Sequence, residues 1–391
     1  MNILITSDWN TAAINGVATS IRDLTYALRC RGHEVKILSL SSNGHNRVTN
    51  DGWEVASLPA GVVYPEARVR VGFMHRIYDQ IVDWGPDIIH SQCEMSTFIM
   101  AQHLARECLV PVVHTYHTVY EDYTHYFVPD IIPSTHVADL ADKVAKGAVS
   151  EFSKFVSGKC DAFIAPTPKV KELLEKYNCK CPIEVIPSGI ELDKYRKTLS
   201  DNERNELLNK YGIDNNSIIA LYLGRLGEEK NIEELMTMWM KYHPKNSKLI
   251  IAGGGPYLDT LLEHAKELNS SSQIVFAGMI DREDTWKYYQ LADFFMSAST
   301  SETQGLTYIE ALSSGLPLLC RQDSCLDNVV IPYENGVCFT NEEEFKDGLE
   351  FILNLIHSEG YNRKEIGATA NHFSRAYFGE AVERLYESIL F

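Results

Sequence analysis

Short runs of apolar and β-branched residues alternate along the chain with longer stretches whose apolar residues recur every three or four positions. In the first half these runs predict strands at 3–6, 34–40, 87–90, 111–114 and 162–165. Between the first two, residues 17–31 carry Ile21, Leu24 and Leu28 at helical spacing, and Gly32 follows as a stop. This alternation is typical of βαβ units and a parallel sheet.

The pattern restarts near residue 187. A run at 183–186 ends in Pro187-Ser188-Gly189, and further strands are predicted at 218–223, 249–252, 274–276, 294–297 and 316–319. We therefore predict an α/β protein with two Rossmann-like, doubly wound domains, at 1–186 and 187–373, joined by a hinge near 187–198. The segment at about 374–391 is an amphipathic helix that either completes the second domain or crosses back to the first.

Composition adds a constraint on partners. Of the 391 residues, 45% are hydrophobic, enough for two ordinary cores. The net charge of −17 argues against a nucleic-acid partner, because phosphate backbones attract an excess of Lys and Arg. Residues 1–186 hold 17 Lys and Arg against 21 Asp and Glu, whereas residues 187–391 hold 19 against 32. The acidity therefore belongs mainly to the second half.

The sequence also bears on the cellular location of the protein and on metal binding. No secretory signal and no apolar run of about 20 residues is visible, and nine cysteines stand without CxxC pairing, so we expect a reducing cytoplasm. Cys179 and Cys181 are a close pair, but zinc needs about four convergent ligands. His114, His117 and His125 need not converge. We expect no metal and no bound cofactor.

Parallel sheets bind ligands beyond the carboxyl ends of their strands, so the loops there are where chemistry is expected. The first loop, SDWNTAAINGVATSI, has Gly16 as its only glycine, and AGGGP at 252–256 likewise fails the dinucleotide pattern GxGxxG. Gly16 would let the backbone approach a phosphate or a sugar; a plain turn glycine is the alternative. An NAD-linked oxidoreductase is therefore disfavoured.

The stretch GRLGEEKNIEEL brings two cations to the end of a predicted strand. Arg225 stands at the strand's edge and Lys230 precedes the next helix. An anion such as a diphosphate between them would relieve their repulsion. The alternative is that both are solvated and paired with Glu228 and Glu229.

A second loop, STSETQGLTYIE at 299–310, follows the strand at 294–297. Glu302 lies in the loop, Gly305 opens a helix and Glu310 lies in its second turn. Amide N–H groups at the start of this helix would face an anion, and the two carboxylates could accept hydrogen bonds from hydroxyl groups on either side of it. A sugar, a diphosphate and a ribose would satisfy that order.

These pieces together resemble the retaining, nucleotide-sugar-dependent glycosyltransferases of the GT-B fold, in the E-x7-E family of family 4-like enzymes. That fold has two Rossmann-like domains facing a cleft. The resemblance covers essentially the whole chain and rests on NGVATSI, HTYHTVYEDY, IPSGIEL, GRLGEEKNI, AGGGP, VFAGMI, SETQGLTYIEALSSGLP and ENGVCF. HTYHTVYEDYTHYF and SETQGLTYIEAL look most like bacterial enzymes that glycosylate diacylglycerol.

The resemblance implies roles for individual residues. Glu310 would bind the nucleotide ribose and Glu302 a hexose hydroxyl. Arg225 and Lys230 would hold the diphosphate, and His117 would lie beside the donor sugar. Gly278, Met279 and Ile280 would meet the nucleotide base. The rest of the implied donor site consists of Gly16, Thr303, Gln304, Gly305 and Leu306.

The implied chemistry is front-face departure of the diphosphate, which helps to deprotonate the acceptor, with neither a carboxylate nucleophile nor a metal. Cations then matter most, because negative charge develops on the leaving group. Many relatives carry a proline or a Glu-Pro pair where this chain has Thr303 and Gln304. The lipid-glycosylating branch shares that variant.

A lipid acceptor requires a surface that meets the membrane. Residues 61–84 place basic side chains among apolar ones, as in segments that lie on anionic lipids, and lysines 143, 146, 154 and 159 could extend that surface. Solvated cations on a cleft-lining helix are the alternative. The residues assigned to acceptor or membrane contact are Arg68, Arg70, Phe73, Arg76, Tyr116, Glu121, Asp122 and Tyr123.

We therefore predict a cytoplasmic enzyme, peripheral at the inner face of the membrane. It would move a hexose, glucose in the first instance, from a UDP-sugar to diacylglycerol or monoglycosyl-diacylglycerol. The alternatives are the same donor chemistry on a soluble or polymeric sugar, and a GT-B sugar-nucleotide epimerase.

Overall fold

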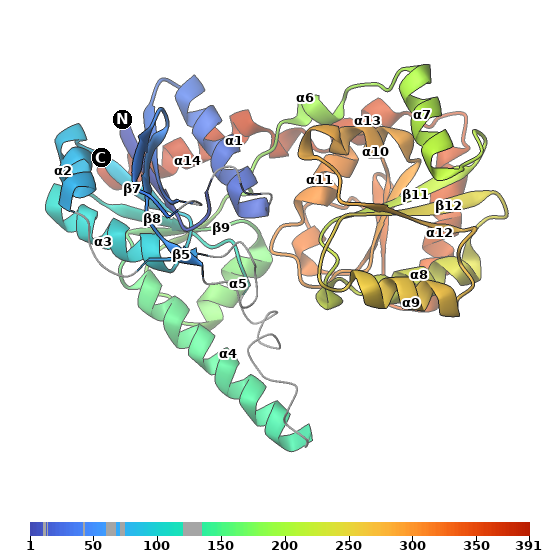
Figure 1. Cartoon of the computed structure of the whole chain (residues 1–391), viewed down its shortest axis with the longest axis horizontal. Helices are drawn as coiled ribbons and strands as arrows, with labels where there is room; N and C mark the ends of the chain where they lie inside the picture. The colour runs from blue at the N-terminus through green and yellow to red at the C-terminus, as the bar shows by residue number, and fades with distance from the viewer. Residues whose placement is uncertain (11–12, 14, 42–43, 60–67, 71–74, 120–134) are drawn as a thin grey trace. The chain divides into compact units, whose positions relative to one another are not determined.

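The computed structural model describes residues 1–391 except 11–12, 14, 42–43, 60–67, 71–74 and 120–134. The chain divides into two compact units: the first is Met1–Ile190 together with Arg375–Phe391, and the second is Glu191–Ser374. Each unit contains a mainly parallel β-sheet flanked by helices (Figure 1). The predicted α/β fold class is confirmed.

The first unit contains an eight-stranded sheet in the order β10-β9-β8-β7-β1-β2-β4-β3, parallel except for β3. Its strands are β1 (Asn2–Ser7), β2 (Glu34–Leu40), β3 (Arg47–Thr49), β4 (Gly52–Val55), β7 (Ile88–Ser91), β8 (Val112–Thr115), β9 (Ala162–Ala165) and β10 (Ile183–Val185). A separate short pair joins β5 (Leu58–Pro59) to β6 (Arg68–Val69). The helices are α1 (Gly16–Cys30), α2 (His75–Trp84), α3 (Ser96–Cys108), α4 (Thr135–Ser157), α5 (Pro168–Lys176) and, from the end of the chain, α14 (Arg375–Leu390).

Alternate residues of the central strands enter different cores, because side chains of a strand point to opposite faces. Ile3 and Ile5 of β1 pack in one core with α1 and α14, whereas Leu4 packs in another with α2 and α3. Both faces of the sheet are thereby covered, which explains why β1 reads as an uninterrupted apolar run.

Helix α14 belongs to the first unit and lies beside α1 (Figure 1). Phe378 and Val382 are buried in the core that contains β1, and Gly379 permits the close approach of Ala27 of α1. The chain leaves the first unit after Ile190, four residues beyond the predicted boundary, because Ser188 bonds Ser20 of α1 at 2.9 Å.

The second unit contains a six-stranded, fully parallel sheet in the order β13-β12-β11-β14-β15-β16. Its strands are β11 (Ile218–Leu223), β12 (Ser247–Ala252), β13 (Ile274–Gly278), β14 (Phe294–Ser297), β15 (Leu318–Arg321) and β16 (Gly336–Phe339). Its helices are α6 (Leu192–Tyr195), α7 (Asp201–Tyr211), α8 (Ile232–Tyr242), α9 (Leu258–Glu267), α10 (Thr285–Leu291), α11 (Leu306–Ser313), α12 (Glu342–Ile356) and α13 (Arg363–Ala368). Four 3₁₀ turns add η2 (Glu228–Lys230), η3 (Arg282–Asp284), η4 (Ser324–Leu326) and η5 (Asn371–Phe373).

The strands predicted from the sequence are present in both units. Those of the first half lie within one residue of an observed strand at each end, and the predictions at 34–40, 162–165, 218–223 and 294–297 match the observed bounds. The prediction at 316–319 is displaced by two residues, because Leu316 is still bonded through its amide to Ala311 of α11. Strands β3 to β6 were not predicted, since two to four residues carry too little periodicity.

Candidate active site

Two loops of the second unit meet at the carboxyl ends of the two central strands of its sheet, β11 and β14. Strands β11 and β14 are adjacent and parallel, with Ala220 opposite Phe294. Their carboxyl ends therefore lie side by side, and so do the segments that follow, 224–231 and 298–305. Asn231 fixes the two segments to each other by donating from its side chain to the carbonyl of Ala298 at 3.1 Å.

A buried ion pair occupies this junction. Lys230 Nζ lies 2.7 Å from Glu302 Oε1, and the Lys230 side chain is almost fully enclosed. Ser301 Oγ, at 3.3 Å from Nζ, and Ser299 Oγ, at 3.2 Å from the same Glu302 oxygen, complete the cluster. Glu302 and Ser301 take two of the three N–H donors of the ammonium group, so with respect to the described residues one donor remains for a ligand.

Lys230 stays charged despite its burial. Burial alone would lower the pKa of Lys230, but the charge of Glu302 and its hydrogen bond outweigh that effect and hold the pKa above its usual value. A permanent, preorganised positive charge at a water-poor site is the kind of group that stabilises a departing anion.

Arg225 has a partner within its own loop. Its Nη1 donates to Glu229 Oε1 at 2.8 Å, and the Arg225 side chain remains partly exposed. Glu229 itself is enclosed, with its carboxylate packed against Gly227. For Arg225 the structure therefore contains the pairing with Glu229 that the sequence left open as an alternative, and the assigned contact with a diphosphate stays a prediction.

Helix α11 begins immediately after Gly305, as predicted. Gly305 has φ +70°, a conformation that side chains other than glycine rarely adopt, and an added Cβ would lie 2.3 Å from the ring of Tyr308. No side chain caps the amino end of α11. Gln304 is buried and Thr303 half-buried, and Leu306 is the first helical residue.

Glu310 lies in α11 and is held by two tyrosines. Tyr195 of α6 donates to Oε1 at 2.6 Å, and Tyr289 of α10 donates to Oε2 at 2.7 Å. Burial raises the pKa of Glu310, and the two phenol hydrogen bonds oppose that rise. Sequence reasoning missed both tyrosines, because nothing in their local pattern links them to Glu310.

The residues assigned to the nucleotide base lie at the end of β13. Gly278 has φ +73°, Met279 is 71% exposed and Ile280 is half-buried. The amide of Gly253 donates to the carbonyl of Gly278 at 2.8 Å, so the AGGGP loop lies against this turn. An exposed apolar side chain next to a turn of the backbone can pack against the flat face of a nucleotide base.

In the first unit, Gly16 and His117 are placed at the expected ends of elements. Gly16 is the first residue of α1, after the N-cap Asn15, and is exposed. His117 follows β8, and its Nε2 lies 2.7 Å from Oε1 of Gln92. Burial lowers the pKa of His117 to about 4, with the charge of Glu94 acting in the opposite direction. His117 is thus a neutral imidazole near pH 7.

One residue assigned to acceptor or membrane contact is corrected. Tyr116 is only 1% exposed and packs in the core beside β9, with its hydroxyl 3.2 Å from Ser153, so it faces neither a membrane nor an acceptor. Arg68 donates to Ser57 and Arg70 to the carbonyl of Ala56, and both are partly exposed, so their contact with an acceptor or a membrane stays a prediction.

The remaining assignments on this surface divide into two groups. Arg76 is exposed on α2, where a membrane contact stays a prediction. The rest lie outside the described residues: Phe73, Glu121, Asp122 and Tyr123. Within the described part of the chain, no helix is long and apolar enough to cross a membrane, and no group of three or more His, Cys, Asp or Glu side chains could hold a metal.

Sequence reasoning also missed a polar cluster at the carboxyl ends of β1, β7 and β8. Asp8 accepts from the amide of Thr97 at 2.8 Å, and Glu94 lies 3.1 Å from Nε2 of His114. Burial raises the pKa of Asp8 to about 6. Their spacing in sequence gives no signal, because the loops after β1 and β7, strand β8 and helix α3 bring them together.

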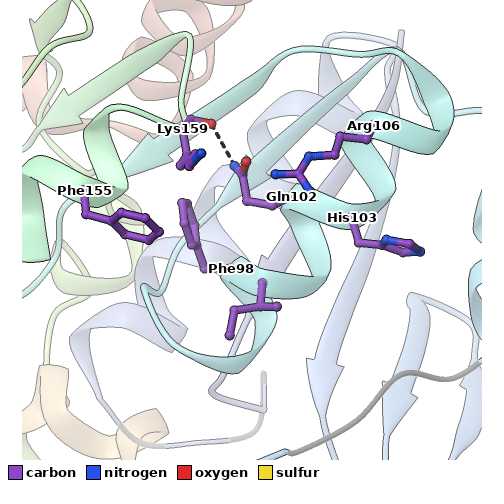
Figure 2. A pocket seen from close by; sticks show the side chains of 7 residues that line it. Phe98, Gln102, His103, Arg106, Phe155 and Lys159 are labelled. Atoms are coloured by element: carbon purple, nitrogen blue, oxygen red, sulfur yellow. Dashed lines mark hydrogen bonds between the residues drawn. The ribbon is translucent and has the colours of Figure 1, made fainter.

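A groove opens on the surface of the first unit between α3 and the end of α4 (Figure 2). We call it the α3–α4 groove; it measures about 210 Å³ and is lined by Phe98, Ile99, Gln102, His103, Arg106, Phe155 and Lys159. Ile99 and Phe155 are 59% and 60% exposed, and Lys159 lies over the Phe155 ring at 5.8 Å. Gln102 donates to the carbonyl of Lys159 at 2.8 Å, which ties the two walls together.

The sequence matches two family models and is similar to two enzymes that share one name. Residues 14–194 match the family model "Glycosyltransferase Family 4", and residues 203–370 match "Glycosyl transferases group 1". The chain is 33% identical over 393 residues to alpha-monoglucosyldiacylglycerol synthase of Streptococcus pneumoniae, covering 99% of this chain and 85% of the relative. It is 30% identical over 400 residues to the enzyme of the same name from Acholeplasma laidlawii, covering 100% and 98%.

Solved structures agree on the fold. Sucrose-phosphate synthase of Thermosynechococcus elongatus superposes with a TM-score of 0.73 at 18% identity, over 99% of this chain and 98% of the other. Anabaena HepE, solved in complex with UDP-glucose, superposes with a TM-score of 0.71 at 14% identity, over 99% and 100%. The expected GT-B fold is thereby confirmed.

Proposed function

The chain belongs to the family 4 glycosyltransferases, and from that premise we propose that it transfers a hexose from a UDP-sugar to a lipid hydroxyl group, with retention of configuration. Glucose is the proposed hexose, and diacylglycerol or monoglycosyl-diacylglycerol the proposed acceptor. The two relatives matched over nearly the whole chain bear the name alpha-monoglucosyldiacylglycerol synthase, which supports this acceptor.

The buried Lys230–Glu302 pair is the observation that carries the proposal. Lys230 is charged, nearly enclosed and fixed by Glu302 at 2.7 Å, next to the uncapped amino end of α11. As the bond between sugar and diphosphate breaks, negative charge grows on the diphosphate. An ammonium group and free helix N–H groups already in place stabilise it without reorganisation.

The other assigned residues supply orientation in this scheme. Glu302 accepts a sugar hydroxyl through its carboxylate group, and Glu310, held by Tyr195 and Tyr289, accepts the ribose hydroxyls. His117 faces the donor sugar as a neutral ring. The departing diphosphate takes the proton of the acceptor hydroxyl on the face that it leaves, which accounts for retention without a carboxylate nucleophile.

A donor-by-acceptor screen tests this function. The purified protein is offered UDP-glucose, UDP-galactose and GDP-mannose, each with diacylglycerol, monoglucosyl-diacylglycerol or free sugars, and products are identified by mass spectrometry and NMR. We expect an α-glucosyl lipid from UDP-glucose only. Transfer solely to free sugars would replace the lipid acceptor, and rearranged UDP-sugar without transfer would indicate an epimerase.

We also propose that the α3–α4 groove contacts an anionic bilayer. Exposed Ile99 and Phe155 next to Arg106 and Lys159 combine apolar and cationic groups, as in interfacial surfaces. Such a contact would bring the enzyme to its lipid acceptor at the inner face of the cell membrane.

Flotation with phosphatidylglycerol vesicles tests that contact. The double variant Phe155→Ser, Lys159→Glu should bind about tenfold more weakly, since each basic residue near an anionic surface contributes about 1 kcal/mol. The control, Tyr333→Ser with Lys346→Glu, likewise replaces an aromatic residue by serine and a lysine by glutamate, at exposed positions of the second unit. Equal recovery of both variants at low salt would refute this role of the groove.

A further inference from the structure

Gln92 and His117 come from the ends of neighbouring strands. Strands β7 and β8 are parallel, with Ser91 opposite His114, so the residues just beyond their carboxyl ends lie side by side. The backbone of Gln92 is fixed further by its amide, which donates to the carbonyl of Thr6 at 2.9 Å. Gln92 is 2% exposed, so its side chain has little freedom.

One hydrogen bond joins the two side chains. His117 Nε2 lies 2.7 Å from Gln92 Oε1. An amide oxygen only accepts hydrogen bonds, so Nε2 must carry the proton. A neutral imidazole has a single N–H group, and Nδ1 is then left with a lone pair.

The opposite nitrogen of His117 has no partner among the described residues. No hydrogen bond joins Nδ1 to any of them, and His117 is half-buried. The amide nitrogen of Gln92 is buried, and no described residue accepts a hydrogen bond from it. One nitrogen of the ring is thus held by Gln92, and the other presents an acceptor.

We propose that Gln92 is a positioning residue that fixes the tautomer of His117, so that Nδ1 accepts a hydrogen bond from a hydroxyl group of the substrate. This inference rests on the proposed function, which puts His117 beside the donor sugar. It assigns a direction to that contact: His117 recognises a donor group, a sugar or glycerol hydroxyl, and does not donate to a phosphate or carbonyl oxygen. A substrate analogue with fluorine in place of that hydroxyl would lose the contact.

The surroundings keep the ring in the required neutral form. Among the described residues, Glu94, His114 and His90 interact electrostatically with His117. Burial lowers the pKa of His117 to about 4; Glu94 raises the pKa and His114 lowers it further. Because the His117 ring is neutral at pH 7, it can adopt either of two tautomers, and the hydrogen bond to Gln92 selects one of them.

Nitrogen NMR of the full-length protein labelled at histidine reads the tautomer directly. The protonated and bare nitrogens of a neutral imidazole have well-separated shifts, and His117 is assigned by loss of its signals in His117→Asn. We expect a protonated Nε2 and a bare Nδ1 in the wild-type protein without substrate. A protonated Nδ1 would overturn the proposal. This measurement needs no turnover, so it stands even if the screen for glycosyl transfer fails.

Two variants connect the tautomer to the reaction. Gln92→Met keeps the length of the side chain but removes the acceptor, and should lower kcat by about tenfold or more, as the loss of a partner on a functional histidine does elsewhere. The KM for UDP-sugar should change less than about threefold, because one hydrogen bond to the ring is lost and the diphosphate site is not altered. Gln273→Met is the control: it also removes an amide acceptor, one that Ser272 bonds at 2.6 Å, at a position that has no role in the proposed site or in membrane contact.

The variant Gln92→Glu distinguishes a positioning role of Gln92 from a purely structural role. A carboxylate also accepts from Nε2, but its charge raises the pKa of His117. The kcat of this variant should be low in acid and rise toward the wild-type value as pH passes above the new pKa, where the neutral Nε2–H form returns. If Gln92→Met, shown to be folded by its melting curve, retains wild-type kcat, or if Gln92→Glu shows no recovery with pH, the positioning role is refuted.

Discussion

At the scale of single residues, the second unit keeps a buried charge by pairing it. Lys230 and Glu302 lie 72 positions apart in sequence and 2.7 Å apart in the fold. Removing either partner leaves the other uncompensated in an enclosed site, which is unfavourable even before any substrate binds. The Lys230–Glu302 pair therefore affects both the stability of the second unit and, in the proposed function, catalysis. The two effects must be measured separately.

Lys230→Met should lower kcat/KM by about 100- to 1,000-fold, the range typical for removing one group that stabilises transition-state charge. The protein should remain folded, because methionine fills the same volume without a charge. Steady-state rates with UDP-glucose, together with UDP binding by calorimetry, give the two effects separately. Lys241→Met, which breaks an exposed pair with Glu342 in the same unit, is the matched control and should change the rate less than twofold. An unchanged kcat/KM in Lys230→Met would remove Lys230 from the site.

Asp8 provides a prediction about stability and pH. Burial raises the pKa of Asp8 from 3.8 to about 6 in the folded protein, with the amide of Thr97 opposing the rise. The folded state thus binds the proton more tightly than the unfolded state, so the stability contributed by protonated Asp8 is complete below about pH 4 and is lost as pH rises through about 6.

Asp8→Asn should therefore gain stability relative to the wild-type protein as pH rises. The relative gain between about pH 4 and pH 7.5 should reach up to about 3 kcal/mol, from two pKa units at 1.36 kcal/mol each. Urea unfolding of both proteins across this pH range measures it. A difference between the two proteins that stays constant with pH would show that Asp8 titrates normally.

At the scale of elements, the start of α11 depends on one glycine. Gly305 has a positive φ, and Tyr308 occupies the space in which a Cβ would stand. The Tyr308 ring is itself fixed, through a hydroxyl bond to Ser297 at 3.0 Å and an edge contact with Phe295 at 5.7 Å. A side chain at 305 must therefore move the amino end of α11.

Gly305→Ala should weaken UDP binding by about tenfold or more, because a displaced helix end costs roughly 1–3 kcal/mol in strain and lost contacts. Gly212→Ala is the matched control, since Gly212 also has a positive φ and ends α7 in the same unit, but no atom lies near its added Cβ. The control shares the backbone strain of about 1 kcal/mol without the clash. Calorimetric titration with UDP should show equal affinities for wild type and Gly212→Ala; equal losses in both variants would assign the effect to strain alone.

At the scale of the whole molecule, the cores of the two units are separate. The core cluster of the second unit contains residues from 218 to 356 only, and that of the first unit draws Phe378, Val382 and Tyr386 from α14. The first unit is therefore discontinuous in sequence, and the second is an uninterrupted insertion between Ile190 and Arg375.

A fragment of residues 191–374 should consequently fold alone and bind UDP within about tenfold of the full chain's affinity, since the residues assigned to the donor lie in it, except Gly16 and His117. Circular dichroism and calorimetry test this, with Lys230→Met in the fragment as the control for specific binding. Conversely, deleting residues 375–391 should unfold the first unit, because it removes four buried side chains from its core. A soluble, folded fragment without UDP affinity would place the nucleotide site elsewhere.

Much of this organisation was predictable. Strand positions follow from local runs of apolar residues, which is why those at 34–40 and 218–223 match residue for residue. The ends of strands also indicated which loops hold Lys230, Glu302 and His117. Contacts on the surface were predicted less well: Tyr116 was assigned to acceptor or membrane contact, but its side chain is buried in the core beside β9.

The sequence by itself determined the class of fold, the restart of the βα pattern near residue 187 and the loops in which the chemistry lies, because hydrophobic periodicity and helix-starting glycines are local properties of the chain. Only the tertiary structure decided which side chains meet. That Glu302 bonds Lys230, that Tyr195 and Tyr289 hold Glu310, that Gln92 bonds His117, and that α14 joins the first unit all depend on strand order and on the direction of side chains. Such pairings are set by packing between segments far apart in sequence, for which no local pattern carries information.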